Sequence, residues 1–269
     1  MSSRIVALLT DFGYRDPFVG IMKGVMLGIN PDLQLIDLSH GTAPQGIREA
    51  ALVLSTSCPY FPPHTIFLVV VDPGVGGTRR PIVAETADHL FVAPDNGVLG
   101  LALDQAEVRR VIHVTDTRYF RQPISRTFHG RDVFAPLAAW LSRGAQAHEM
   151  GTTIDDYQRL ELPRPRVQAG EELAGEVIYR DRFGNLITNI AEAWVTEIWG
   201  TPPWPGIEVH IDASVIRGLD SHYAQRSSQE LGIIINSWGL LEVFANGGSA
   251  AQATGAAEGS PVRIRRGER

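Results

Sequence analysis

Apolar and polar positions alternate along the first half of the chain in a repeating order of strand and helix. Residues 5–10 form a short apolar run that predicts a strand, and residues 18–29 carry apolar side chains at helical spacing. Residues 66–71 are continuously apolar and rich in β-branched side chains, which is typical of a central parallel strand. Further strands are predicted at residues 33–38, 81–84, 90–93 and 111–114, and further helices at 47–57 and 133–141. This order predicts a layered α/β domain with a mostly parallel sheet.

The pattern changes after residue 160. Residues 160–170 contain Pro163 and Pro165 and no periodicity, so we expect a linker at 163–170. Short strands are predicted at residues 173–179, 186–190, 206–211, 231–235, 240–244 and 261–264, and residues 250–259 are interpreted as a loop. The sequence therefore predicts an N-terminal α/β domain over residues 1–162 and a smaller C-terminal antiparallel domain, resembling a β-barrel, over 171–269.

Composition and charge narrow the classes of function. The chain has 269 residues, of which 44% are hydrophobic and 20% charged, as in ordinary globular proteins. Its net charge is -6, and basic residues cluster only near the C-terminus, so nucleic acid is not an expected partner. No apolar segment approaches the roughly 18 residues of a membrane span, and the N-terminal run is too short for a signal peptide. The single cysteine, Cys58, excludes an internal disulfide framework, and we expect a cytoplasmic protein that keeps this side chain buried.

Polar clusters follow several of the predicted strands. Asp11 and Asp16 come directly after the first strand. In an open α/β sheet, ligands collect outside the carboxyl ends of the strands, so these carboxylates are candidates to bind sugar hydroxyls or an amine. Asp16 precedes Pro17, and capping of the following helix is an equally good interpretation of Asp16.

A glycine-rich loop follows the most apolar strand. Asp72 opens this loop and Arg79 lies near its end, with glycines between them that let the backbone approach a ligand closely. A phosphate-binding loop would end in GK[ST] and lead into a helix. Here Arg80 and Pro81 lead into another predicted strand, so a phosphate-binding loop is not expected.

Two more clusters complete the set. Asp95 and Asn96 belong to an Asn-Gly turn signal, and turn formation is the favoured interpretation for both. His129 lies just before a predicted helix whose expected N-cap is Asp132, and the histidine is harder to explain by a structural role. The histidines lack HxH, HExxH and cysteine-containing spacings, and the G-x-S-x-G motif of serine hydrolases is absent. A metal site built from scattered Asp and His side chains stays open.

Seven sequence blocks carry a resemblance to a known family. They are LLTDFGYRDPFVGIMKG, IDLSHG, VVDPGVGGTRR, VAPDNGVL and FHGRDVFAPLAA in the first part, and DRFGNLITNI and INSWGLLEVFANGGSA in the second. Together they resemble the S-adenosyl-methionine (SAM) hydroxide adenosyltransferases, or SAM hydrolases, which are relatives of the SAM-dependent fluorinase and chlorinase. The resemblance implies an enzyme that hydrolyses SAM to adenosine and methionine without a cofactor or metal. It also implies a homotrimer, with SAM bound between the N-terminal domain of one subunit and the C-terminal domain of its neighbour.

The resemblance assigns roles to residues of the first domain. Asp72, Arg79 and His129 match the Asp–Arg–His set that lies near the reacting carbon in the family. Asp11 matches the residue that holds the ribose hydroxyls, and Asp16 matches the residue that holds the methionine amine.

In the second domain, Asn185, Ser237 and the backbone around Asn246 and Gly247 match positions that meet the methionine and adenine ends of SAM. The halogenases differ in the first domain, because they lack the acid and the histidine of the catalytic set. Their halide pocket favours small hydroxyl and aromatic groups, so this sequence resembles the branch that uses water.

We therefore hypothesise that Asp72, Arg79 and His129 hold and polarise a water in line with the bond between the ribose 5′ carbon and sulfur. Two other classes stay open. One is a metal-dependent phosphoesterase or nucleosidase that uses Asp11, Asp72, Asp95 and His129, and the other is a non-catalytic sensor of SAM or adenosine. Halogenase activity is an alternative within the same family.

Overall fold

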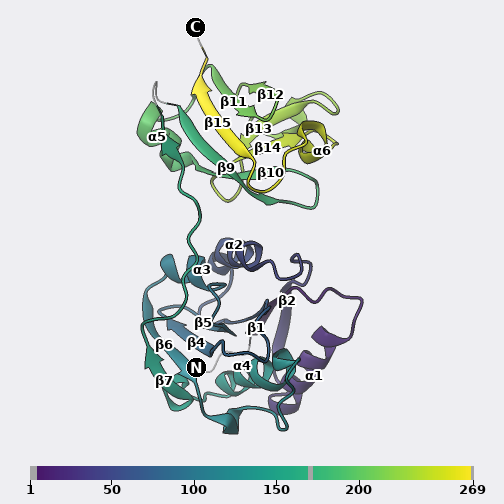
Figure 1. Ribbon diagram of the computed structural model, residues 1–269, viewed down its shortest axis with the longest axis vertical. Helices are drawn as coiled ribbons and strands as arrows, with labels where there is room; N and C mark the ends of the chain where they lie inside the picture. The colour runs from purple at the N-terminus through teal and green to yellow at the C-terminus, as the bar shows by residue number, and fades with distance from the viewer. Residues whose placement is uncertain (1–4, 169–171, 268–269) are drawn as a thin grey trace. The chain divides into compact units, whose positions relative to one another are not determined.

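The computed structural model describes residues 5–168 and 172–267, and the chain divides into two compact units, Met1–Glu161 and Leu162–Arg269 (Figure 1). The predicted linker at 163–170 contains strand β8 (Arg166–Val167), which pairs with the second unit's strand β9 (Leu173–Arg180). The last two linker positions and the predicted start of the second domain at residue 171 lie outside the described residues. The predicted domain bounds therefore stay a prediction.

The first unit is built on a seven-stranded sheet in the order β2-β1-β3-β5-β4-β6-β7. Its strands are β1 (Ile5–Thr10), β2 (Gln34–Ser39), β3 (Ile66–Val70), β4 (Pro81–Thr86), β5 (Leu90–Pro94), β6 (Val108–Val114) and β7 (Gly151–Ile154). Strands β2, β1, β3 and β5 pair in parallel, whereas β4 is antiparallel to β5 and β6, and β6 is antiparallel to β7. Strands β4 and β7 thus run against the other strands of the sheet, and the predicted α/β class is confirmed.

Helices cover both faces of this sheet (Figure 1). The helices are α1 (Phe18–Ile29), α2 (Ile47–Ser57), α3 (Gly100–Asp104) and α4 (Ala135–Ser142), with short 3-10 turns at Cys58–Tyr60, Thr117–Tyr119 and Ala147–Glu149. In β1, Val6 and Leu8 pack in the core cluster with α1 and α4, whereas Ala7 and Leu9 pack in the cluster with α2 and α3. Burial on both faces explains why this strand is apolar at successive positions.

The second unit is an antiparallel sheet that nearly closes on itself. Its further strands are β10 (Leu186–Ala191), β11 (Ile207–Ile211), β12 (Ser214–Arg217), β13 (Leu231–Ile235), β14 (Leu240–Ala245) and β15 (Pro261–Arg266). The order is β12-β11-β15-β9-β10-β14-β13, and a bridge between Leu219 and Ile233 links the two ends. The predicted β-barrel-like class of this unit is confirmed.

Two short helices of the second unit were not predicted, α5 (Glu192–Trp199) and α6 (Ala250–Thr254). The interpretation of residues 250–259 as a loop is wrong at its start. The Ser249 side chain accepts a hydrogen bond from the Gln252 backbone N–H at 3.2 Å, and Gly255 ends the helix with φ of 80°. Capping at both ends thus stabilises a helix too short to show periodicity. A 3-10 turn at Tyr223–Gln225 completes the elements of this unit.

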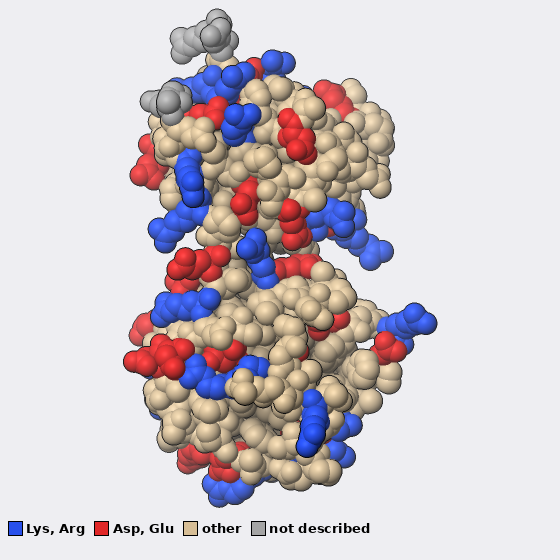
Figure 2. Space-filling view, viewed as in Figure 1, with Lys and Arg blue, Asp and Glu red and all other residues tan. Residues whose placement is uncertain are grey.

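The surface carries charges of both signs. On the face drawn in Figure 2, basic and acidic side chains are interspersed over each unit.

Cys58 is buried, as predicted, and burial raises the pKa of its thiol to about 12. Across residues 5–168 and 172–267, no helix has both the length and the apolar character that crossing a membrane requires.

Candidate active site

Asp72, Arg79 and His129 come together in the first unit. The Nε of Arg79 donates to both carboxylate oxygens of Asp72 at 3.0 and 2.9 Å, and its Nη2 also donates to Oδ2. The same Nη2 lies 2.7 Å from Nδ1 of His129. The Asp72 side chain is 4% exposed and that of Arg79 is 10% exposed. The three residues that the resemblance named lie up to 57 positions apart in the sequence, and in the structure they form one hydrogen-bonded row.

This row fixes the state of the histidine. A guanidinium only donates, so Nδ1 of His129 accepts from Arg79 and the ring proton lies on Nε2. Burial lowers the pKa of His129, the positive charge of Arg79 lowers it further, and the charges of Asp72 and Asp132 oppose the shift. His129 is therefore a neutral imidazole at pH 7 that presents an N–H donor on its free side.

A π-helix, η3 (Gly130–Phe134), follows His129 directly and continues into α4. The wide turn lets the Phe134 ring lie under the guanidinium of Arg79, with its centroid 5.0 Å from Cζ. Single π-turns inside helices occur often at functional sites. The helix thus holds both the histidine and the apolar support of the arginine.

The predicted N-cap role of Asp132 is wrong. The helix begins one turn earlier than expected, so Asp132 lies within the π-helix and is fully buried. Its carboxylate accepts from the Nε of Arg131 at 2.7 Å, from the backbone N–H of Ser125 at 2.9 Å and from Arg121 at 3.3 Å. Asp132 thus anchors the loop that precedes His129.

Gly76 is required for the close approach of two loops. It has φ of 75°, and a Cβ at this position would overlap the backbone carbonyl of Arg126. Residue 76 lies in the loop between Asp72 and Arg79, and residue 126 lies just before His129. The absence of a side chain at Gly76 thus lets the arginine and the histidine meet.

Asp11 shares a cleft with Asp72. The cleft has a volume of about 390 Å³, and its walls include the apolar side chains of Phe12, Phe18 and Val75. The Oδ2 atom of Asp11 accepts from the backbone N–H of Gln45 at 2.8 Å, and the other carboxylate oxygen has no partner among the hydrogen bonds of the described residues. The cleft thus places a carboxylate beside the charged row, as expected for residues after neighbouring parallel strands.

Asp16 does not cap helix α1. The helix begins at Phe18 with Pro17 as its N-cap residue, and the cap lacks a side-chain hydrogen bond. Asp16 is exposed, and the hydrogen bonds and ion pairs found among the described residues do not include its carboxylate. The structural interpretation of Asp16 is therefore wrong, and its carboxylate is available to a ligand.

Asp95 and Asn96 are tied into the fold. Asp95 is 3% exposed, receives the Nε of Arg80 at 2.7 Å, and receives the backbone N–H of Gln158. The Asn96 side chain donates to the carbonyl of Val71 at 2.8 Å. The Asn96 side chain also accepts the backbone N–H two residues later, the turn contact predicted for Asn96. Asp95 does not join the row of Asp72. Within the described parts of the chain, no group of three or more His, Cys, Asp or Glu side chains is placed to hold a metal ion.

The second unit has a pocket of its own, with a volume of about 760 Å³. Asn185, Asn246 and Gly247 all line it, so three of the four residues expected in this domain lie together. Ser237 does not line it and lies exposed in the turn between β13 and β14. The structure thus separates Ser237 from the other three.

Sequence reasoning missed Asp181, which also lines this pocket. Its carboxylate accepts from the backbone N–H groups of Phe183 and Asn185 at 2.9 and 2.8 Å, and from the Asn185 side chain at 2.9 Å. An Asp that precedes a glycine turn and binds the backbone two residues later is a known turn pattern, which was the available signal. Asp181 thus fixes the amide of Asn185 in the pocket wall.

The two motifs of the second unit meet at Gly184. This glycine has φ of 85°, and a Cβ here would overlap the side chain of Ser249. The carbonyl of Gly184 also accepts from the backbone N–H of Ala251 at 2.9 Å. The FGN and NGGS segments therefore form one wall because residue 184 has no side chain.

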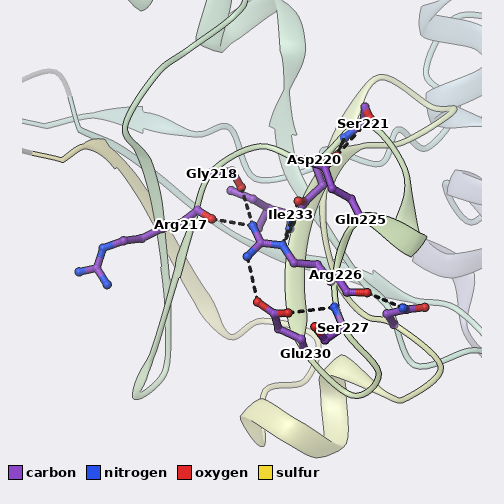
Figure 3. A network of polar contacts seen from close by, with 10 residues as sticks. Arg217, Gly218, Asp220, Ser221, Gln225, Arg226, Ser227, Glu230 and Ile233 are labelled. Carbon is purple, nitrogen blue, oxygen red and sulfur yellow. Dashed lines mark hydrogen bonds and ion pairs between the residues drawn. The ribbon is translucent and has the colours of Figure 1, made fainter.

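A network around Arg226 supports the same pocket (Figure 3). The Nε of Arg226 donates to Asp220 at 2.8 Å, and its Nη2 donates to the carbonyl of Arg217 at 2.6 Å. The carbonyl of Arg226 accepts from the side chain of Asn246 at 2.6 Å. Arg226 thus ties the end of β12 to the pocket residue Asn246, a connection that the sequence did not reveal.

Comparison with known proteins identifies the family of this chain. The SAM hydroxide adenosyltransferase N-terminal domain matches residues 6–151, and the C-terminal domain of the same family matches residues 175–263. The chain belongs to this family. The matched ranges of the SAM hydroxide adenosyltransferases include the row and the cleft in the first unit, and the whole lining of the pocket in the second.

Individual proteins are similar to this chain over nearly its full length. The (R)-S-adenosyl-L-methionine hydrolase of Thermus thermophilus is 36% identical over 268 residues, which covers 97% of this chain and 99% of that protein. The fluorinase of Actinopolyspora mzabensis is 24% identical over 294 residues, with 98% of each chain covered. The crystal structure of an uncharacterized conserved protein from Thermotoga maritima has a TM-score of 0.90 at 35% identity and covers 97% of this chain and 100% of that chain.

Proposed function

We propose that this protein is an enzyme that hydrolyses SAM to adenosine and methionine. The observation that carries the proposal is the row of Asp72, Arg79 and His129 beside the cleft that Asp11 lines. Relatives that are 33–39% identical to this chain bear the name (R)-S-adenosyl-L-methionine hydrolase, which supports the same substrate. The charged row supports water, rather than halide, as the nucleophile.

The reaction is an in-line displacement at the ribose 5′ carbon. The oxygen of water forms a bond to this carbon while the carbon–sulfur bond breaks. The electron pair of the carbon–sulfur bond goes to sulfur. The positively charged sulfonium becomes the neutral thioether of methionine, so the leaving group needs no proton. The attacking water loses one proton, and the products are adenosine, methionine and a proton.

The hydrogen bonds of the row support Asp72 as the proton acceptor. Arg79 only donates, and His129 has its acceptor nitrogen occupied by Arg79, so its free nitrogen also donates. Asp72 accepts from Arg79 on both oxygens, and Oδ1, which accepts only one of these hydrogen bonds, keeps a further lone pair. We propose that His129 Nε2–H orients the water and that Asp72 accepts its proton, a form of general-base catalysis that contributes about 10²–10⁴-fold.

The remaining assignments follow the family resemblance. Asp11 binds the ribose hydroxyls and Asp16 binds the methionine amine, and both carboxylates have free oxygens in this structure. Asn185, Ser237, Asn246 and Gly247 bind the methionine and adenine ends. The protein acts as a cytoplasmic homotrimer in which each SAM contacts two subunits, and it needs neither a cofactor nor a metal.

Turnover and binding measured on the same variants test this mechanism. Asp72→Asn keeps the shape of the row and removes the proton acceptor, so we expect kcat to fall by about 10²–10⁴-fold. SAM affinity in isothermal titration calorimetry should stay within a few-fold of wild type. His129→Gln is the matched variant, because its amide keeps a donor and we expect it to retain more activity than His129→Ala. Unchanged kcat in Asp72→Asn contradicts the assignment.

A further inference from the structure

Behind the cleft lies a chain of polar contacts that the proposed mechanism does not use. Thr10 Oγ1 lies 2.8 Å from Nδ1 of His40, and Nε2 of His40 lies 2.9 Å from Oδ1 of Asp37. The other Asp37 oxygen receives the Nζ of Lys23 at 2.7 Å. Thr10 and His40 are 0% and 1% exposed, respectively. The order Thr–His–Asp resembles a nucleophilic triad, but a fully buried hydroxyl cannot reach a substrate, so it has another role.

A bulge in the sheet creates this chain. Along β1 and β2, Leu8 pairs with Asp37 but Leu9 pairs with Ser39, so Leu38 is an extra residue. In a regular strand, side chains three positions apart point to opposite faces. The bulge shifts this alternation, so the side chains of Asp37 and His40 point to the same side and form their hydrogen bond. Bulges often re-aim a side chain next to an active site.

When Nε2 of His40 carries the ring proton, the hydrogen bonds of the chain run in one consistent direction. Burial raises the pKa of Asp37, but hydrogen bonds from Lys23 and His40 outweigh burial and leave this pKa below its usual value. The ionised Asp37 accepts Nε2–H of His40, so Nδ1 accepts the hydroxyl proton of Thr10. The Thr10 oxygen then accepts the backbone N–H of Phe12 at 3.2 Å. Each polar group of the chain has a partner in this arrangement.

The segment that follows β1 and the segment that follows β2 also meet at Asp11. The backbone N–H of Gly13 donates to the carbonyl of His40 at 2.8 Å, and the backbone N–H of Gln45 donates to Asp11 at 2.8 Å. Gln45 adopts φ of 64°, a left-handed conformation that costs energy for a residue with a side chain. The contacts of His40 therefore lie on both sides of Asp11 along the chain.

We infer that His40, held by Asp37, is a positioning residue that acts through Thr10 to fix the carboxylate of Asp11 for binding of the ribose hydroxyls. The inference rests on the proposed function, because that function gives Asp11 its ligand. It assigns a role to the IDLSHG block, which the catalytic row leaves without one.

Removal of the Thr10 hydroxyl tests the inference. Thr10→Val keeps the shape of the side chain and loses the contacts to His40 and Phe12, whereas Thr10→Ser keeps them. Thr86→Val is the matched control. Thr86 is also buried and also makes two hydrogen bonds, both to the backbone of His89. The strand register places it at the opposite end of the strands from Thr10.

The first readout is the preference for SAM over its analogue that lacks the ribose 2′-hydroxyl, as a ratio of kcat/KM values. We expect Thr10→Val to lower this ratio by about tenfold, the factor that one ordinary hydrogen bond supplies, mainly through KM for SAM. Thr10→Ser and Thr86→Val should keep the wild-type ratio. A Thr10→Val variant that loses activity equally on both substrates has a merely structural defect and overturns the inference.

The second readout does not depend on SAM turnover. In hydrogen–deuterium exchange without ligand, Thr10→Val should speed exchange of the amides of Phe12, Gly13 and Gln45 by about tenfold or more. Thr86→Val should leave these amides unchanged. Unchanged exchange in Thr10→Val overturns the inference. Failure of the proposed function is read separately, from a wild-type protein that leaves SAM intact.

Discussion

At the residue scale, the candidate chemistry depends on how Arg79 is shared. It gives two nitrogens to Asp72 and one contact to His129, and the ring of Phe134 supports its plane. A lysine could not make this set of contacts, because a compact ammonium lacks the planar fork of a guanidinium. The position of each donor and acceptor in the row thus follows from one side chain.

The neutral state of His129 gives a prediction about pH. Burial and the charge of Arg79 lower its pKa from the usual value of 6.5, so the neutral form persists below that pH. In a proton NMR titration of the histidine ring, the pKa of His129 should lie below 6.5 in the wild type. Because the neutral ring is the form that accepts from Arg79, kcat/KM should be retained above this pKa and lost as pH falls through it.

The matched variant is Arg79→Gln, which removes the positive charge and leaves Asp72 beside the ring. We expect the His129 pKa to rise in this variant. A pKa that stays where it is in the wild type would show that Arg79 does not set the protonation state.

The residues that the sequence analysis named come together more completely in the first unit than in the second. Asp11, Asp72, Arg79 and His129 belong to long motif blocks, and the structure brings them to one cleft and one row. Asp181, in contrast, was not singled out by the sequence analysis, although it lines the pocket of the second unit. Local sequence patterns predict backbone turns well, but they do not predict which turns line the same cavity.

At the element scale, long amphipathic segments were predictable and short capped ones were not. The bounds of α1 and α2 match their predicted ranges. Helix α6 has only five residues and depends on its two caps, so it leaves no periodic signal. The π-helix at Gly130–Phe134 begins with Gly, Arg and Asp, which give no apolar periodicity, so the sequence pattern placed the start of this helix only at residue 133.

The contact between the two active-site loops predicts a strong effect of one methyl group. Gly76→Ala places a Cβ against the carbonyl of Arg126 in a left-handed conformation that costs about 1–2 kcal/mol. We expect the free energy of unfolding in urea to fall. We also expect kcat to fall by more than the loss of folded protein would explain. Gly24→Ala is the control, because a Cβ at this exposed helical position has open space. Equal kcat in the two variants would contradict the role of Gly76.

Strand β14 carries a buried carboxyl whose ionisation should affect stability. Glu242 is 3% exposed, and burial raises its pKa although hydrogen bonds from Asn236 and Tyr223 oppose the shift. The folded state then holds its proton more tightly than the unfolded state, so stability falls as pH rises from 4.5 through the raised pKa. Glu242→Gln should remove this pH-dependent loss and raise the free energy of unfolding at pH 7–8.

Glu230→Gln is the control of opposite sign. The pKa of Glu230 is lowered by a backbone hydrogen bond from Ser227 and by Arg226, so its stabilising contribution is present above 4.5 and lost in acid. Urea unfolding of both variants between pH 4 and 8 measures the two slopes. A Glu242→Gln variant with the wild-type pH dependence would show that this carboxyl does not titrate in the range.

At the scale of the whole molecule, the two units each hold part of the residues assigned to SAM. The proposed homotrimer joins the first unit of one subunit to the second unit of another. Inactive subunits with defects in different units should therefore complement one another. We expect co-assembled Asp72→Asn and Asn185→Ala subunits to regain activity, because about a quarter of the sites in a random mixture combine two intact units.

Light scattering on the same samples should give a mass three times that of the 29.4 kDa chain. Mixing after assembly, without subunit exchange, is the control and should leave activity at the level of the separate variants. Complete absence of recovered activity in co-assembled trimers would place each site within one subunit.

The most direct test of the central claim is chromatography of the purified protein after incubation with SAM in halide-free buffer that contains EDTA. The proposed function predicts that adenosine and methionine appear in equal amounts, at a rate proportional to enzyme, and that the Asp72→Asn variant forms neither at a comparable rate. Intact SAM after hours of incubation with the wild type, or products that appear only when metal is restored, would contradict it.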